Sequence, residues 1–83
     1  MGGGLNLAAL KREIYPLPDY VRQALLAVNL MGAYDRRPPY QRNDYIGWII
    51  RAKHESTQLK RLNQMLAELQ TGDKYMGMDY HAK

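Results

Sequence analysis

Residues 37–53 read RPPYQRNDYIGWIIRAK, and this stretch decides the fold. Two prolines precede a run that holds the single tryptophan of the chain. A proline pair ends any preceding helix, and proline suits the first turn of the next one. The pattern therefore predicts a helix from about Tyr40 to Lys53, with basic residues at both ends.

The predicted helix 40–53 carries an unusually wide apolar arc. On a period of 3.6 residues, four apolar residues share one face and two isoleucines lie on the adjoining flank. The face consists of Tyr45, Trp48, Ile49 and Ala52, and the flank consists of Ile46 and Ile50. Such a helix is either central, with neighbours on two sides, or presents an interface to a partner. Gly47 weakens the helix, so we expect it to allow close approach of a neighbouring helix.

Two helices are predicted before residue 37. The first runs from Asn6 to Tyr15, because asparagine is a good N-cap and Pro16 disfavours the helical conformation of the residue before it. The second opens with the Leu-Pro-Asp signal at residues 17–19. Its expected apolar stripe is Leu17, Val21, Ala24, Leu25 and Val28. Asn29 interrupts this stripe and is expected to cap a further turn through Tyr34.

The last predicted helix starts at Glu55 or Ser56 and ends at Gly72 as its C-cap. Its leucines are spaced 3-4-3, which predicts an amphipathic helix with a buried leucine stripe. The stripe is Leu59, Leu62, Leu66 and Leu69, and the opposite, solvated face is Lys60, Arg61, Gln64 and Glu68.

These elements predict an all-α fold, a compact bundle of four to five short helices in a single domain. With 83 residues, the chain has room for one domain. We expect a disordered N-terminus over residues 1–4, where three glycines follow the first methionine, and a helical domain over residues 5–72. Residues 73–83 show no period and are expected to form a flexible tail.

The composition narrows the class of protein. The formal net charge is +4, which suits an ordinary small domain and also permits binding to acidic surfaces. No cysteine is present, so disulfides and thiolate metal sites are excluded. No apolar run approaches the roughly 18 residues of a membrane span, and the start lacks a signal-peptide pattern. A cytoplasmic protein is expected.

The residues that usually carry chemistry are sparse. The two histidines, His54 and His81, lie in a turn and in the tail, and no third ligand accompanies Asp79 and His81. The few hydroxyl side chains lie near helix ends, where they commonly act as caps. The sequence therefore predicts a protein that is not an enzyme and has no metal site and no cofactor.

Two binding hypotheses remain open. In the first, the apolar arc of helix 40–53 binds a protein partner or a second copy of the chain, through Tyr45, Ile46, Trp48 and Ile50. In the alternative, a basic patch contacts the phosphates of a nucleic acid or another anion, through Arg37, Arg42, Arg51, Lys53, Lys60 and Arg61. A helix that reads a nucleic acid needs polar side chains that reach the base edges. The most basic predicted helix has few of them, which argues against the alternative.

The same residues resemble the YdeI/OmpD-associated family, also called bacteriocin-protection proteins. The likeness covers about residues 17–76. It rests on Leu17-Pro18-Asp19, Ala24-Leu25-Leu26-Ala27, Pro38-Pro39-Tyr40-Gln41-Arg42, Tyr45-x-x-Trp48-Ile49, Ala52-Lys53, Thr57, and Lys60-Arg61 before Leu62.

The resemblance implies an all-α module linked to envelope stress and to resistance against bacteriocins or cationic peptides. It implies no established catalytic residues. Where the family often has Glu-Thr-Arg after Ala-Lys, residues 55–58 read ESTQ, so an arginine of the family pattern is missing.

Overall fold

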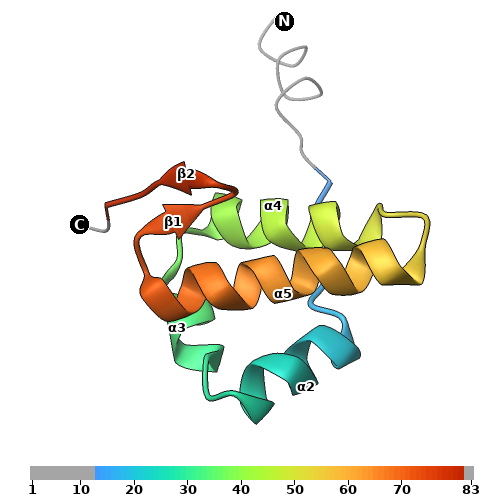
Figure 1. Ribbon diagram of the computed structural model, residues 1–83, viewed down its shortest axis with the longest axis horizontal. Coiled ribbons are helices and arrows are strands. Elements are labelled where there is room, and N and C mark those ends of the chain that lie inside the picture. Colours follow the sequence, from blue (N-terminus) through green and yellow to red (C-terminus); the bar gives the residue numbers. More distant parts are fainter. Residues whose placement is uncertain (1–12, 82–83) are drawn as a thin grey trace, which may run out of the picture.

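The computed structural model describes residues 13–81, and a pair of antiparallel helices forms its framework (Figure 1). Helix α4 spans Pro39–Ile50 and helix α5 spans Glu55–Thr71. A short turn over residues 51–54 joins them, so the two helices lie side by side. Both predicted helices are confirmed, although α4 ends at Ile50, three residues earlier than expected. Gly72 closes α5 with a φ of 81°, as predicted.

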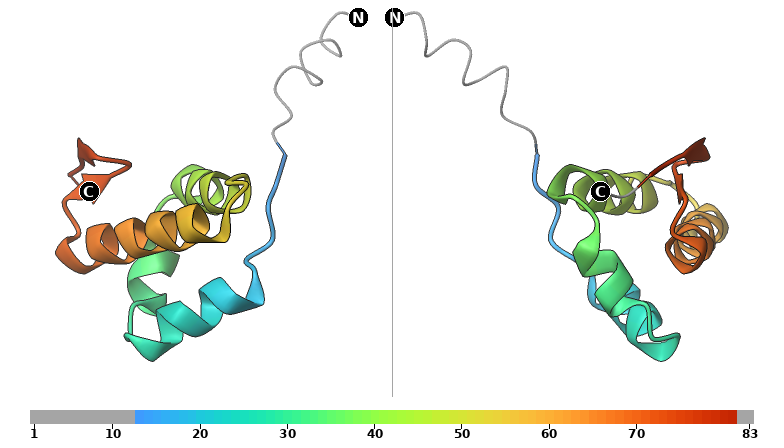
Figure 2. Two further views of the ribbon diagram at one scale, coloured as in Figure 1. Left: turned by 45° about the vertical axis from the view of Figure 1, so that its right-hand side comes forward. Right: turned by 90° about the vertical axis from the view of Figure 1, so that its left-hand side faces the viewer.

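Two shorter helices pack against one side of this pair (Figures 1 and 2). Helix α2 spans Asp19–Ala27 and helix α3 spans Met31–Arg36. Val21 and Leu25 of α2 are fully buried, which confirms the centre of the predicted stripe. The end of the predicted stripe is wrong, because Val28 is half exposed where the chain turns toward α3.

Asn29 ends α2 and does not cap α3. It adopts the left-handed conformation with a φ of 60°. The Leu30 amide donates to the carbonyl of Leu25, and the Asn29 amide donates to that of Leu26, at 2.8 and 3.1 Å. This bond pair is a Schellman motif, in which asparagine tolerates the left-handed position better than other non-glycine residues.

We expect Asn29→Gly to leave the free energy of unfolding unchanged or slightly higher. Asn29→Ala should lower it by about 1 kcal/mol, because alanine is strained at positive φ. Urea melts of both variants followed by circular dichroism check this order. Equal stabilities would show that the conformation of Asn29 carries no cost.

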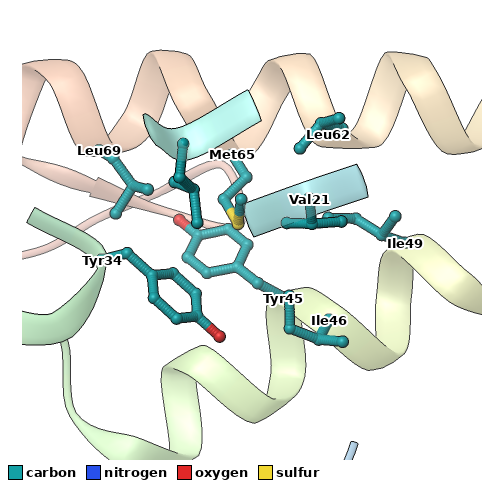
Figure 3. Close-up of a cluster of buried hydrophobic side chains, with 9 residues drawn as sticks. Val21, Tyr34, Tyr45, Ile46, Ile49, Leu62, Met65 and Leu69 are labelled. Atoms are coloured by element: carbon teal, nitrogen blue, oxygen red, sulfur yellow. The ribbon is translucent and has the colours of Figure 1, made fainter. Parts of the chain in front are cut away.

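The core lies between α4, α5 and the α2–α3 layer (Figure 3). Tyr45, Ile46 and Ile49 of α4 are almost completely buried, with Met65 and Leu69 of α5 and Tyr34 of α3 close around them. The buried cluster consists of Val21, Leu25, Tyr34, Tyr45, Ile46, Ile49, Leu62, Met65 and Leu69. The wide apolar arc of α4 is therefore explained by neighbours on two sides.

A two-stranded antiparallel hairpin follows α5, so the fold is mostly helical but not strictly all-α. Its strands are β1, Lys74–Tyr75, and β2, Met78–Asp79. Met76 and Gly77 between them have φ values of 52° and 83°, the two left-handed positions of a type I′ turn. The sequence predicted a flexible tail over residues 73–83 and missed this hairpin. Its turn signal is weak, because only one of the two left-handed positions is a glycine.

The N-terminal predictions fall largely outside the described residues. This applies to disorder over residues 1–4 and to most of the helix expected from Asn6. Its last residues, Glu13–Tyr15, are not helical and lead into α2 as an extended segment (Figure 2). Within residues 13–81, every helix is too short or too polar to cross a membrane.

Candidate functional site

A buried polar cluster lies beneath the hairpin, centred on Glu68 of α5. Only 7% of Glu68 is exposed. Its carboxylate accepts hydrogen bonds from the Tyr45 hydroxyl at 2.5 Å and from the Met76 and Gly77 amides, both at 2.8 Å. The Gln64 amide donates a fourth at 3.2 Å. The prediction that Glu68 faces solvent is wrong, because the hairpin covers this part of α5.

The surroundings of Glu68 fix the charge of the cluster. Burial raises the pKa of the Glu68 carboxyl, but the bonds from Tyr45, Gly77, Gln64 and Met76 favour the ionised form and hold the pKa below its ordinary 4.5. Burial, followed by the bond to Glu68, raises the pKa of Tyr45 well above 10. At neutral pH, Glu68 is therefore an anion and Tyr45 its neutral donor.

Arg37 belongs to the same cluster and not to an exposed basic patch. It is only 6% exposed. Its guanidinium donates to Gln41 Oε1 and to the backbone carbonyl of Glu68, both at 3.1 Å, and lies 4.7 Å from the ring centre of Tyr80. The sequence placed Arg37 in an anion-binding patch, whereas in the structure these partners enclose its guanidinium. Gln41, fully buried, was missed, since nothing in the sequence separates it from surface glutamines.

Two other predicted basic residues are held against aromatic rings. Arg51 donates to the Tyr15 hydroxyl at 2.9 Å. Arg61 donates to the Trp48 carbonyl at 2.6 Å and lies 5.3 Å from the centre of its indole ring. A guanidinium over an aromatic face is favourable without any ligand.

The structure does not gather the six predicted basic residues into one patch. Arg42 is half-buried, whereas Lys53 and Lys60 are exposed and form no ion pair among the described residues. Arg37 precedes α4 and Lys53 follows it, and a helix of this length separates its ends by about 18 Å. The patch expected to contact a nucleic acid is therefore divided.

The predicted partner surface is also mostly occupied within the chain. Tyr45 is fully buried and Ile46 is 1% exposed, while Trp48 and Ile50 are half-buried at the edge of the core. Ile46, predicted as a partner contact, instead packs in the core, because α4 is covered on its Ile46 flank as well as on its α5 face.

Exposed apolar side chains gather instead between α2 and the first turns of α5. A groove of about 470 Å³ lies there, lined by Tyr20, Glu55, Ser56, Gln58 and Leu59. Tyr20 is 48% and Leu59 is 57% exposed. The sequence placed Leu59 in the buried stripe, but Leu62, Met65 and Leu69 fill the core and leave Leu59 outside it. No pattern in the sequence joins Tyr20 to Leu59, which lie on helices far apart in the chain.

Comparison with known families identifies the chain. A family model described as "Bacteriocin-protection, YdeI or OmpD-Associated" matches residues 15–72, more than half of the sequence. The chain belongs to this family. No curated protein and no solved structure matches it.

The part that matches the YdeI/OmpD-associated family coincides with the helical framework. It begins at Tyr15 and ends at Gly72, the C-cap of α5, so it contains α2 to α5 and stops before the hairpin. The family resemblance of the sequence is confirmed. The matched region also includes Tyr20 and Leu59, so the groove is made entirely by residues of the family module.

Proposed function

We propose that this member of the YdeI/OmpD-associated family is a small, non-enzymatic helical module that binds a partner protein in the groove between α2 and α5. The observation that supports this proposal is the exposure of Tyr20 and Leu59 in one concave surface. Large apolar side chains that meet in a groove are typical of protein-binding sites, whereas single exposed ones are ordinary. The family description supports a role in protection against bacteriocins, with binding as the contribution of this module.

The charges near the groove select the partner. Lys53 and Lys60 stand on either side of the first turn of α5 and are exposed without an ion pair among residues 13–81. The groove itself contains one carboxylate, that of Glu55. We therefore propose a partner segment that inserts apolar side chains between Tyr20 and Leu59 and places carboxylates against the two lysines. Complementary charge of this kind raises the association rate and selects among partners.

An acidic amphipathic peptide, with leucines on one face and glutamates on the other, tests the groove. In titrations followed by amide NMR, we expect shifts at residues 19–21 and 53–60. Leu59→Ser should weaken binding about tenfold, because apolar anchors at interface centres contribute more than 1 kcal/mol each. Met78→Ser, which changes an exposed side chain on the hairpin, is the matched control and should bind like the unchanged protein.

Two results would overturn the proposal. One is equal binding of a peptide with lysines in place of the glutamates. The other is binding of a short DNA duplex that weakens steeply as salt rises, with a log–log slope of about −0.9 per phosphate contact. That second result would make phosphate binding by Lys53, Lys60 and the other accessible basic residues the function.

A further inference from the structure

The outer face of α4 holds an extended peptide segment, residues Glu13–Tyr15, here called the arm. The side chain of Asn43 forms hydrogen bonds with the backbone of the arm. Its Oδ1 accepts from the Tyr15 amide and its Nδ2 donates to the Glu13 carbonyl, both at 2.8 Å. One amide side chain thus satisfies a donor and an acceptor of the arm, as a neighbouring strand would.

The ring of Tyr15 lies one helical turn further along α4, over Gly47. A Cβ atom added at Gly47 would stand 2.6 Å from Cε2 of this ring, so only glycine leaves room for it. Gly47 therefore permits the approach of an aromatic ring, where the sequence predicted the approach of a helix. Arg51, a further turn along, covers the ring and donates to its hydroxyl. Asn43, Gly47 and Arg51 thus make up a strip of surface, here called the α4 groove, that binds backbone at one end and a tyrosine at the other.

We infer that this α4 groove is a self-association site, in which a second copy of the chain docks its own arm. The inference does not depend on the proposed function, because no residue of the α4 groove lines the groove at Tyr20 and Leu59. We choose a second copy as the occupant because the segment that fits the α4 groove within one chain is one that every copy carries. Exchange in both directions closes a two-fold dimer without any new surface.

The connection between the arm and α2 supports exchange. Pro16 and Pro18 flank Leu17, and Pro18 is extended, with φ −65° and ψ 149°. The prolines prevent the arm from continuing α2, so it leaves the helix as a separate segment. The bonds from Asn43 and Arg51 and the space over Gly47 all belong to α4 and its C-cap residue, and none of them comes from the connection to α2. An arm from another copy can make the same contacts.

Exchange competes with docking of a chain's own arm. A short connection holds the arm near its own groove at an effective concentration of millimolar order. Below that concentration the unchanged protein should remain monomeric. The site is therefore tested with two variants, neither of which can form the complete contact between arm and groove within a single copy.

The first variant, Asn43→Ala with Gly47→Ala, closes the groove and keeps the arm. The second, Tyr15→Ala, keeps the groove and removes the ring. Sedimentation velocity at high micromolar concentration should show each variant as a monomer and their equal mixture as a species of about twice 9.6 kDa. Labelled Tyr15→Ala protein in the mixture should show NMR shifts at residues 43–51. If the double variant does not melt cooperatively, Gly47→Ala alone replaces it.

The control adds Tyr15→Ala to the closed-groove variant, which should abolish association with the second variant. A mixture that stays monomeric while both variants melt cooperatively would overturn the inference. So would a control mixture that dimerises as well as the test mixture, since neither copy then offers a tyrosine.

Discussion

Ile46→Lys is expected to unfold the domain, whereas Ile50→Lys should leave it folded. Ile46 is 1% exposed within the core, so the substitution removes its packing and buries an ammonium group. Each effect costs several kcal/mol. A chain of 83 residues has a total stability of about 4 to 12 kcal/mol, so little or none would remain.

Ile50 is the matched comparison, because it lies on the same helix, one turn later, at the edge of the core. A lysine there can extend its ammonium into water, and we expect a loss of about 1 kcal/mol. Thermal melts followed by circular dichroism separate the two variants. A folded Ile46→Lys protein with a near-normal midpoint would place Ile46 on the surface and restore it as a partner contact.

Glu68→Ala is expected to lower the free energy of unfolding by about 3 kcal/mol, because the buried Tyr45 hydroxyl and the Met76 and Gly77 amides lose their acceptor. For a domain of this size the melting temperature should fall by about 15 °C. Gln70→Ala, at an exposed position of the same helix, is the control and should change it little. Calorimetry that gives equal midpoints for the two variants would show that the hydrogen bonds accepted by Glu68 add no net stability.

The same carboxylate gives the stability a defined pH dependence. The folded pKa of Glu68 lies below its ordinary 4.5, so its contribution is complete above that pH and is lost as the pH falls through the folded value. We expect urea midpoints to drop on acidification below about 4.5, and to drop less in Glu68→Gln, which carries no titrating group. Parallel curves for the two proteins would assign the acid sensitivity to other carboxyls.

The sequence predicted best the helix starts and ends, which depend on the local backbone conformation of proline and glycine. The start of α2 after Leu17-Pro18, the start of α4 at the proline pair (to within a residue) and the end of α5 at Gly72 were all predicted, because proline and glycine restrict or permit particular dihedral angles. The centre of the core also followed, since Tyr45 and Ile49 share one face of a helix. The family resemblance arose from these same positions.

The candidate sites could not be predicted because they depend on tertiary contacts. The 3-4-3 leucine spacing selected Leu59 for burial and Glu68 for solvent, and the fold reverses both. The hairpin makes the burial of Glu68 possible, yet its turn shows only a Met-Gly pair, a weak signal beside Asn-Gly. The arm contacts join residues 30 or so positions apart, a pairing that helical periodicity does not report.

Glu68 also constrains how the sequence of this protein can evolve. Its side chain holds the turn at Met76 and Gly77, and its backbone carbonyl accepts from Arg37, so three distant segments meet at one residue. Substitutions at such a junction are not independent in their effects. We expect relatives that have lost this glutamate to differ also at Arg37 and in the hairpin, so that the three segments are inherited or replaced together.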